Sequence, residues 1–223
     1  MAKIKKTDSP VYEKDILHPQ LYFPTTVYSI KKIDFLDVVT SASNDALDLV
    51  KKDIQVNETY PVIMSGSMSG DPRLKDFEQY IAQSGWLILE SQGYDVDNIG
   101  TIISELWCQE HFKYSGMEQH VHPHGVLLSG FYFLETPENG SMIQIYDPRP
   151  GKVQASLPEK NNKIITDSSN TILIKPEPGM LVISNSWLPH SFTRNASDKA
   201  CKFIHFNISI INTYTENTGP III

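Results

Sequence analysis

Two segments in the first hundred residues carry apolar side chains at helical spacing. The first runs from Phe35 to Val50, where apolar positions recur every three or four residues, as on one face of an amphipathic helix. The second opens at Asp71-Pro72, because aspartate suits the N-cap and proline suits the first helical position. Its predicted end is Gly85. This N-terminal part is therefore predicted to be helical or mixed.

From about residue 101 the pattern changes to short runs rich in Ile, Val, Phe and Tyr, which is typical of β-strands. Turn residues such as Pro178-Gly179 separate the runs. An earlier run, Leu21–Ile30, contains Pro24 and is therefore predicted to be an edge strand. The other predicted strands are Thr101–Phe112, Val126–Leu134, Met142–Tyr146, Thr171–Ile174, Met180–Ile183 and Cys201–Ile211.

Many short strands without helices between them predict a mainly β fold of the sandwich, barrel or jelly-roll kind, with the N-terminal helices packed on it. A chain of 223 residues fits one such unit. We expect a single domain over residues 1–223, with a helical or mixed part at 1–100 and the β core at 101–211. The polar loops 64–70 and 153–163 are candidate lids over a site.

Composition and charge narrow the class of partner. The 40% apolar and 20% charged fractions are those of an ordinary globular protein. The net charge of −7 argues against a nucleic-acid partner, since phosphate contacts need a basic face. No secretory signal or membrane-spanning run is expected, and two cysteines are too few for a disulfide framework. The sequence predicts a cytoplasmic protein and leaves homo-oligomerisation open.

Histidines provide the strongest chemical signal. His120, His122 and His124 fall within five residues, and on an extended chain the first two point to one face. Imidazole is the commonest metal ligand in proteins, so this pair is a candidate metal site. A third ligand must come from elsewhere, and His190, after the predicted strand Met180–Ile183, is the natural candidate.

The run from His120 to Leu134 resembles the iron(II)/2-oxoglutarate-dependent oxygenases, in particular a microbial and phage family with an H-x-H-P…S-G-x-Y-Y pattern. The segments Tyr146–Arg149, Pro178–His190 and His205–Asn207 extend the resemblance, in the right order, over roughly residues 105 to 210. This resemblance implies a double-stranded β-helix, a jelly-roll core with the metal inside one end.

The resemblance also implies the reaction and its cofactors. These are iron(II) and 2-oxoglutarate, with dioxygen and a small-molecule or peptidyl substrate; hydroxylation of an unactivated C–H bond releases succinate and CO2. It makes His120, His122 and His190 the metal ligands, with His122 where the common pattern has a carboxylate. Asp147 stays open as an alternative carboxylate ligand, against a simpler role in capping a turn.

The anchor for 2-oxoglutarate is less clear from the sequence. The resemblance implies an arginine or lysine on the last core strand, but the matching position is Cys201. Lys202 follows it and is the expected anchor, provided that a β-bulge turns its side chain toward the histidines. The alternative cations are Lys199, Arg194 and Arg149.

Strand alternation suggests a second cofactor contact. It is expected to put Tyr132 on the histidine-bearing face, where its hydroxyl would reach a bound carboxylate, and Phe131 and Phe133 in the other layer. His18, His111 and His205 are predicted to be structural. For His205, a position facing the barrel interior is the alternative.

Two other readings remain. One is a cupin-like metalloenzyme that uses three histidines without 2-oxoglutarate, which the missing arginine favours. The other is a non-catalytic jelly-roll binding protein, against which the histidine set argues.

Overall fold

The computed structural model describes residues 16–155 and 157–213, and its strands form two antiparallel sheets. The larger sheet contains β1 (Val27–Lys31), β2 (Val62–Met64), β3 (Ile99–His111), β5 (Leu128–Glu135), β8 (Met180–Asn185) and β10 (Cys201–Asn212). The smaller sheet contains β4 (Met117–His120), β6 (Ile143–Tyr146), β7 (Thr171–Ile174) and β9 (His190–Phe192). The α-helices are α1 (Leu36–Lys51), α2 (Lys75–Ser91) and the short α3 (Pro150–Gln154).

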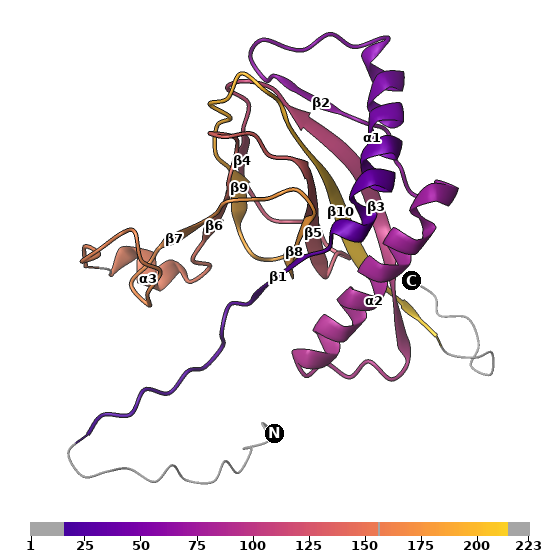
Figure 1. Ribbon diagram of the computed structural model, residues 1–223. Coiled ribbons are helices and arrows are strands. Elements are labelled where there is room, and N and C mark those ends of the chain that lie inside the picture. The colour runs from indigo at the N-terminus through magenta and orange to yellow at the C-terminus, as the bar shows by residue number, and fades with distance from the viewer. Residues whose placement is uncertain (1–15, 156, 214–223) are drawn as a thin grey trace.

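The sheets form a jelly roll with helices on one side. The strand order is β1-β8-β5-β10-β3-β2 in the larger sheet and β4-β9-β6-β7 in the smaller one. Helices α1 and α2 lie on the outer side of the larger sheet, away from the smaller sheet (Figure 1). This arrangement confirms the predicted mainly β jelly-roll core with N-terminal helices packed on it.

Alternation along β10 divides the interior into two cores. Ile204, Phe206 and Ile208 point to the helices and pack in the helix-facing core. Phe203, from the other side of the strand, joins the core between the two sheets. Because successive side chains in a strand point to opposite faces, odd-numbered residues of β10 as far as Asn207 line the space between the sheets. We call this space the barrel interior.

The helical predictions hold except at one end. Helix α1 lies where the first helix was predicted. Asp71 caps the 3-10 turn Pro72–Leu74, which leads into α2, by accepting a hydrogen bond from the Arg73 backbone N–H at 2.9 Å. The prediction that Gly85 ends this helix is wrong, because α2 continues to Ser91. A Cβ atom at Gly85 would lie 2.8 Å from Ile208 Cδ1, so this glycine permits close packing of the helix on the sheet.

Strand predictions succeed for β3, β5, β6, β7, β8 and β10, but not for three of the short strands. Strands β2, β4 and β9 span only three or four residues and were missed. The predicted edge strand is β1, which begins at Val27, after Pro24, and does lie at a sheet edge. Part of the predicted loop 153–163 belongs to α3. The N-terminal part also contributes β1 and β2 to the larger sheet.

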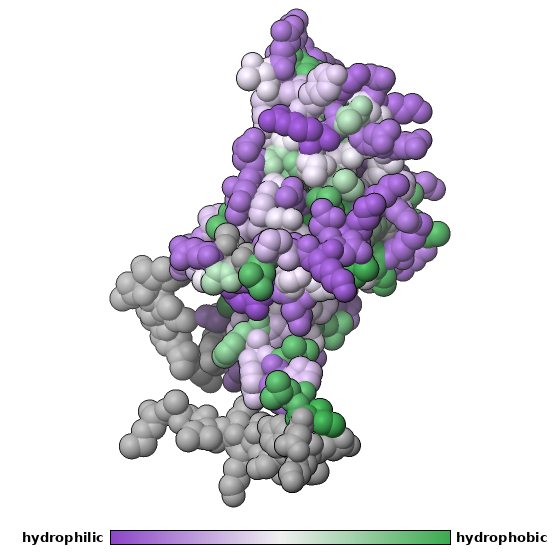
Figure 2. Space-filling view, turned by 90° about the vertical axis from the view of Figure 1, so that its left-hand side faces the viewer, coloured by the Kyte–Doolittle hydropathy of each residue, from purple (hydrophilic) through white to green (hydrophobic). Residues whose placement is uncertain are grey.

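The surface is mostly hydrophilic on the face in Figure 2, with hydrophobic side chains scattered among the polar ones. The most exposed large apolar side chains, Leu17 and Phe23, belong to the extended segment before β1. Within the described ranges, no helix combines the length and the apolar character needed to cross a membrane.

Candidate metal centre

The pairing of β4 with β9 brings the three predicted ligands together. His120 ends β4 and His190 begins β9, and the two are directly opposite each other in the antiparallel register. His122 follows β4, and its backbone N–H donates to the Ser186 carbonyl at 2.9 Å. One ring nitrogen from each of the three histidines lies within 4.8 Å of the others. The predicted trio therefore forms one cluster at an end of the smaller sheet.

Backbone carbonyls fix two of the rings. His190 Nδ1–H donates to the Leu188 carbonyl and His120 Nδ1–H to the Glu118 carbonyl, each at 2.9 Å. A carbonyl oxygen only accepts, so in the neutral rings Nε2 carries the lone pair. Nε2 of His122 lies 3.3 Å from Nε2 of His190. Such outer hydrogen bonds are what orient metal-binding histidines.

Burial favours the uncharged form of two histidines of the cluster, His122 and His190. It lowers the pKa of His122 to about 4, with a smaller contribution from the neighbouring His190 and His120. Burial likewise lowers the pKa of His190 to about 4, against a raising effect of the Leu188 carbonyl. A low-dielectric site disfavours imidazolium, so the ring nitrogens keep lone pairs available for a cation.

A fourth histidine lies beside this cluster. His205 is 2% exposed, and its ring stacks on His122 with centroids 5.0 Å apart and an angle of 15°. The ring of Trp107 lies 4.2 Å from it on the other side, and the edge of Phe131 closes the space toward His190. The sequence signal for the buried position of His205 is strand alternation, because odd-numbered residues of β10 face the barrel interior.

Tyr132 lies on the opposite face from the one predicted. Its hydroxyl donates to the Lys32 carbonyl at 2.7 Å, and its ring packs 5.0 Å from Phe77 of α2. Phe131 and Phe133 instead point into the barrel interior. Nearly all of β5 is buried, so its burial pattern does not reveal which face a residue occupies. The predicted contact of Tyr132 with a cofactor is therefore incompatible with this arrangement.

Lys202 is also on the helix-facing side. Its Nζ donates to Asn44 Oδ1 and Glu135 Oε1, both at 2.8 Å, and lies 3.8 Å from Glu110. The pairing of β10 with β5 does shift between Lys202 and Phe203, but Lys202 stays on the side away from the histidines. The predicted anchoring role thus conflicts with its position. The alternative cations, Arg149, Arg194 and Lys199, are all exposed.

Asp147 does not join the histidine cluster. Its carboxylate pairs with Arg149 at 2.7 Å and Lys152 at 3.1 Å, and it also accepts a hydrogen bond from the Arg149 backbone N–H. The hydrogen bond from the Arg149 side chain is the main cause that holds the pKa of Asp147 well below its usual range. These contacts fit the turn-capping role rather than metal binding.

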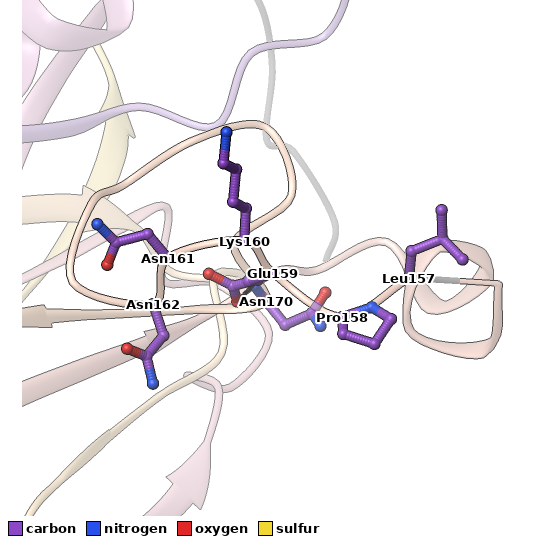
Figure 3. Close-up of a pocket in the computed structure, with 7 residues that line it drawn as sticks. All are labelled: Leu157, Pro158, Glu159, Lys160, Asn161, Asn162 and Asn170. Carbon is purple, nitrogen blue, oxygen red and sulfur yellow. Dashed lines mark hydrogen bonds between the residues drawn. The ribbon is translucent and has the colours of Figure 1, made fainter.

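Two pockets flank the β6–β7 connection. A wide one of about 620 Å³ is formed by residues 157–162 and Asn170. Figure 3 shows Lys160, Asn161 and Asn162 pointing in different directions, so these side chains do not converge on one ligand position. A second pocket, of about 320 Å³, reaches Ile145, which pairs directly with His190. The second pocket is therefore lined by the strand partner of His190, although none of the three clustered histidines lines it.

His111 is a buried histidine outside the cluster. It packs against Phe203, its Nε2 lies 2.9 Å from Gln109 Oε1, and burial lowers its pKa to about 4. Below its unfolded pKa near 6.5 the unfolded chain binds a proton that the folded chain does not, so stability falls as pH drops toward 4. This one group accounts for about 3 kcal/mol over that range.

We therefore expect His111→Phe to reduce the acid sensitivity of the metal-free protein. Urea unfolding at pH 7.5 and at pH 5 should show a smaller loss of unfolding free energy for His111→Phe than for the unchanged chain. His124→Ala, which alters an exposed histidine, should leave the pH dependence as it was. Equal losses in all three proteins would contradict the assignment.

The jelly-roll fold and the cluster of three histidines at one end of its smaller sheet form an arrangement that could hold a metal ion. Residues 105–207 match the family model described as "Putative 2OG-Fe(II) oxygenase", a range that contains all three clustered histidines and His205. This region, which is slightly less than half of the chain, is thus similar to the iron(II)/2-oxoglutarate oxygenases, a family whose cofactors are iron(II) and 2-oxoglutarate. No curated protein sequence matches the chain.

Solved structures share the fold at low sequence identity. A prolyl-4-hydroxylase from Pseudomonas putida is 10% identical with a TM-score of 0.55, covering 82% of this chain and 92% of its own. The viral collagen prolyl hydroxylase of Paramecium bursaria Chlorella virus-1 is 12% identical with a TM-score of 0.51, covering 82% and 94%. The 2-oxoglutarate-dependent epimerase SnoN from nogalamycin biosynthesis is 10% identical with a TM-score of 0.58, covering 86% and 80%.

Proposed function

We propose that this chain is a hydroxylase that inserts oxygen into an unactivated C–H bond of its substrate and releases succinate and CO2 from 2-oxoglutarate. The observation that supports this most directly is the convergence of three imidazole nitrogens within 4.8 Å at one end of the barrel. The family match supplies the reaction class. Hydroxylation, as distinct from other outcomes of the same oxidation, is the proposal.

The proposed iron ligands are His120, His122 and His190. Imidazole is a suitable donor for iron(II), and a facial set of three protein ligands leaves positions open for co-substrate. The carbonyl-fixed rings of His120 and His190 and the low pKa of His190 and His122 fit a cation held by neutral nitrogens. When bound, iron(II) and 2-oxoglutarate would activate dioxygen, which is the oxidant of the reaction.

The protein's own part is to orient and to exclude water. Phe131 lies edge-on to His190, and Phe192 and Phe203 stack at 4.7 Å behind it. This aromatic floor closes the deep side of the histidine cluster, so substrate must approach from the open end. Removal of water from such a site strengthens the electrostatic interactions within it.

The pocket of about 320 Å³ is the proposed substrate entrance. Residues 21–25 before β1 form one wall, and the β6–β7 connection forms the other. Ile145, which lines this pocket, is the strand partner of His190, and this pairing supports the proposed entrance. Because the N-terminal part supplies both this wall and strands β1 and β2, we propose that residues 1–223 act as one oxygenase-like domain.

The test is 2-oxoglutarate turnover by the full chain. With iron(II), dioxygen and a substrate library, we expect succinate to form, and mass spectrometry to show a product heavier by one oxygen atom. Without oxygen, iron(II) plus 2-oxoglutarate should give a weak visible charge-transfer band. A chain that binds iron(II) normally but never binds 2-oxoglutarate would contradict the proposal and favour a cupin-like enzyme.

A further inference from the structure

A group of unpaired polar atoms lies beside His122 in the barrel interior. They belong to Trp107 of β3, Ser129 of β5, and His205 and Asn207 of β10, which we call the polar wall. Four of their buried atoms have no hydrogen-bond partner within the described part of the chain: Trp107 Nε1, Ser129 Oγ, His205 Nδ1 and Asn207 Oδ1. Buried polar groups in native proteins are nearly always hydrogen-bonded, so four neighbouring exceptions indicate a position for a polar ligand.

Strand register places these side chains on three adjacent strands, β5, β10 and β3, beside the proposed iron site. Trp107 is directly opposite His205, and Asn207 is directly opposite Ser129. Side chains opposite each other in an antiparallel pair have Cβ atoms only about 5 Å apart. The His205 ring lies 4.2 Å from the Trp107 ring at a tilt of 37°, and it stacks on His122 at 5.0 Å. The polar wall is thus continuous with the histidine cluster.

The atom types indicate what kind of ligand fits. An indole Nε1–H can only donate a hydrogen bond, and the Ser129 hydroxyl can donate one as well. His205 adds a further donor when its proton is on Nδ1. Asn207 differs from the other three residues. Its Nδ2 donates to Glu105, so the atom left without a partner is the acceptor oxygen Oδ1. Trp107 and Ser129 lie on the strands on either side of β10, which carries His205, and donors in this arrangement match the two oxygens of a carboxylate.

The charge of the site explains why these donors can be neutral. Among the described residues, Lys202 is the single buried lysine or arginine, and it points to the helices. Iron(II) held by three neutral imidazoles keeps its full double positive charge, which equals the double negative charge of 2-oxoglutarate. A second cation is therefore not required for charge balance, and hydrogen bonds suffice to position the far carboxylate.

We propose that Trp107 Nε1–H and Ser129 Oγ–H, assisted by His205, hold the carboxylate of 2-oxoglutarate that lies away from the metal. This inference rests on the proposed function, because it takes the three histidines as the iron ligands. The proposal also relates His122 to the missing interior cation. Because His122 is neutral where a carboxylate would be negative, the iron keeps the positive charge that a lysine or arginine would otherwise add.

Calorimetric titration without oxygen tests this with two ligands. The iron(II)-loaded full chain is titrated with 2-oxoglutarate and with 2-oxovalerate, which has the same chain length but a methyl group in place of the far carboxylate. Trp107→Phe and Ser129→Ala should each weaken 2-oxoglutarate binding by about ten-fold, the loss expected for a hydrogen bond to a charged group. Binding of 2-oxovalerate should be unchanged. Thermal melting confirms that each variant is folded.

Two controls separate the alternatives. Trp86→Phe makes the same substitution on α2, where the indole donates to the Ile99 carbonyl, and should alter neither ligand. Lys202→Met should also leave both affinities unchanged. A selective loss of 2-oxoglutarate in Lys202→Met, or equal losses for both ligands in Trp107→Phe and Ser129→Ala, would overturn the inference while the proposed function stands. Failure of the unchanged, iron-loaded chain to bind 2-oxoglutarate would overturn both.

Discussion

His190→Ala should lower iron(II) affinity by more than about 100-fold and abolish succinate formation. Loss of an outer hydrogen bond to a metal ligand already costs roughly 10–100-fold, and this change removes the ligand itself. His190 is the most buried of the three clustered histidines, at 2% exposure, and its Nε2 lies 3.3 Å from that of His122. Competition of a metal-sensitive dye with the protein for iron(II), without oxygen, measures the affinity.

The third histidine of the run His120–His124 provides a matched control. His124 lies two residues beyond His122 but is exposed and outside the cluster, so His124→Ala should bind iron(II) and form succinate as the unchanged chain does. His122→Ala should lower iron(II) affinity as His190→Ala does. Because His122 is less buried than His190, a loss in both variants is not explained by a packing defect at His190 alone. Equal iron(II) affinity in His124→Ala, His122→Ala and His190→Ala would refute the proposed ligand set.

The spacing of apolar residues predicted the elements in which that spacing repeats several times. Helix α1 and strands β3 and β10 each contain ten or more residues, so their apolar patterns repeat several times. Strands β4 and β9 contain four and three residues, and only their pairing places His120 opposite His190. Sequence motifs identified these histidines, but the contact between them is a property of the sheet.

The face of a buried strand could not be read from its composition. Both sides of β5 face apolar cores, so a shift of one position in the assumed alternation exchanges Tyr132 with Phe131. The face occupied by Lys202 was ambiguous for a related reason. It depended on a β-bulge, and the sequence does not determine whether a bulge turns the side chain. Acceptors on the helix side, Asn44 and Glu135, come from distant segments and hold this lysine there.

Gly130→Ala should destabilise the fold by about 3 kcal/mol, the upper end for an overpacked core. Gly130 lies between Ser129 and Phe131, where β5 pairs with both β8 and β10. An added Cβ would lie 2.4 Å from the Val182 carbonyl oxygen and 2.4 Å from the Phe206 ring. The carbonyl belongs to the backbone of the neighbouring strand and cannot move without disturbing the sheet. The ring is fully buried, so it has no free space to enter.

Urea unfolding of the metal-free chain measures this effect. Gly66→Ala is the matched control, because a Cβ there has no atom within 4 Å, and its unfolding free energy should be nearly unchanged. Gly130→Ala should also weaken 2-oxoglutarate binding under conditions where it stays folded, since displacing β5 displaces Ser129 with it. Equal stability of the two variants would mean that β5, β8 and β10 are not packed as closely as described, and the polar wall beside His122 would then lose its geometric basis. The glycine in the Ser129-Gly130 pair thus links sheet packing to the site: the close approach of the strands that it permits brings the Ser129 hydroxyl next to β10.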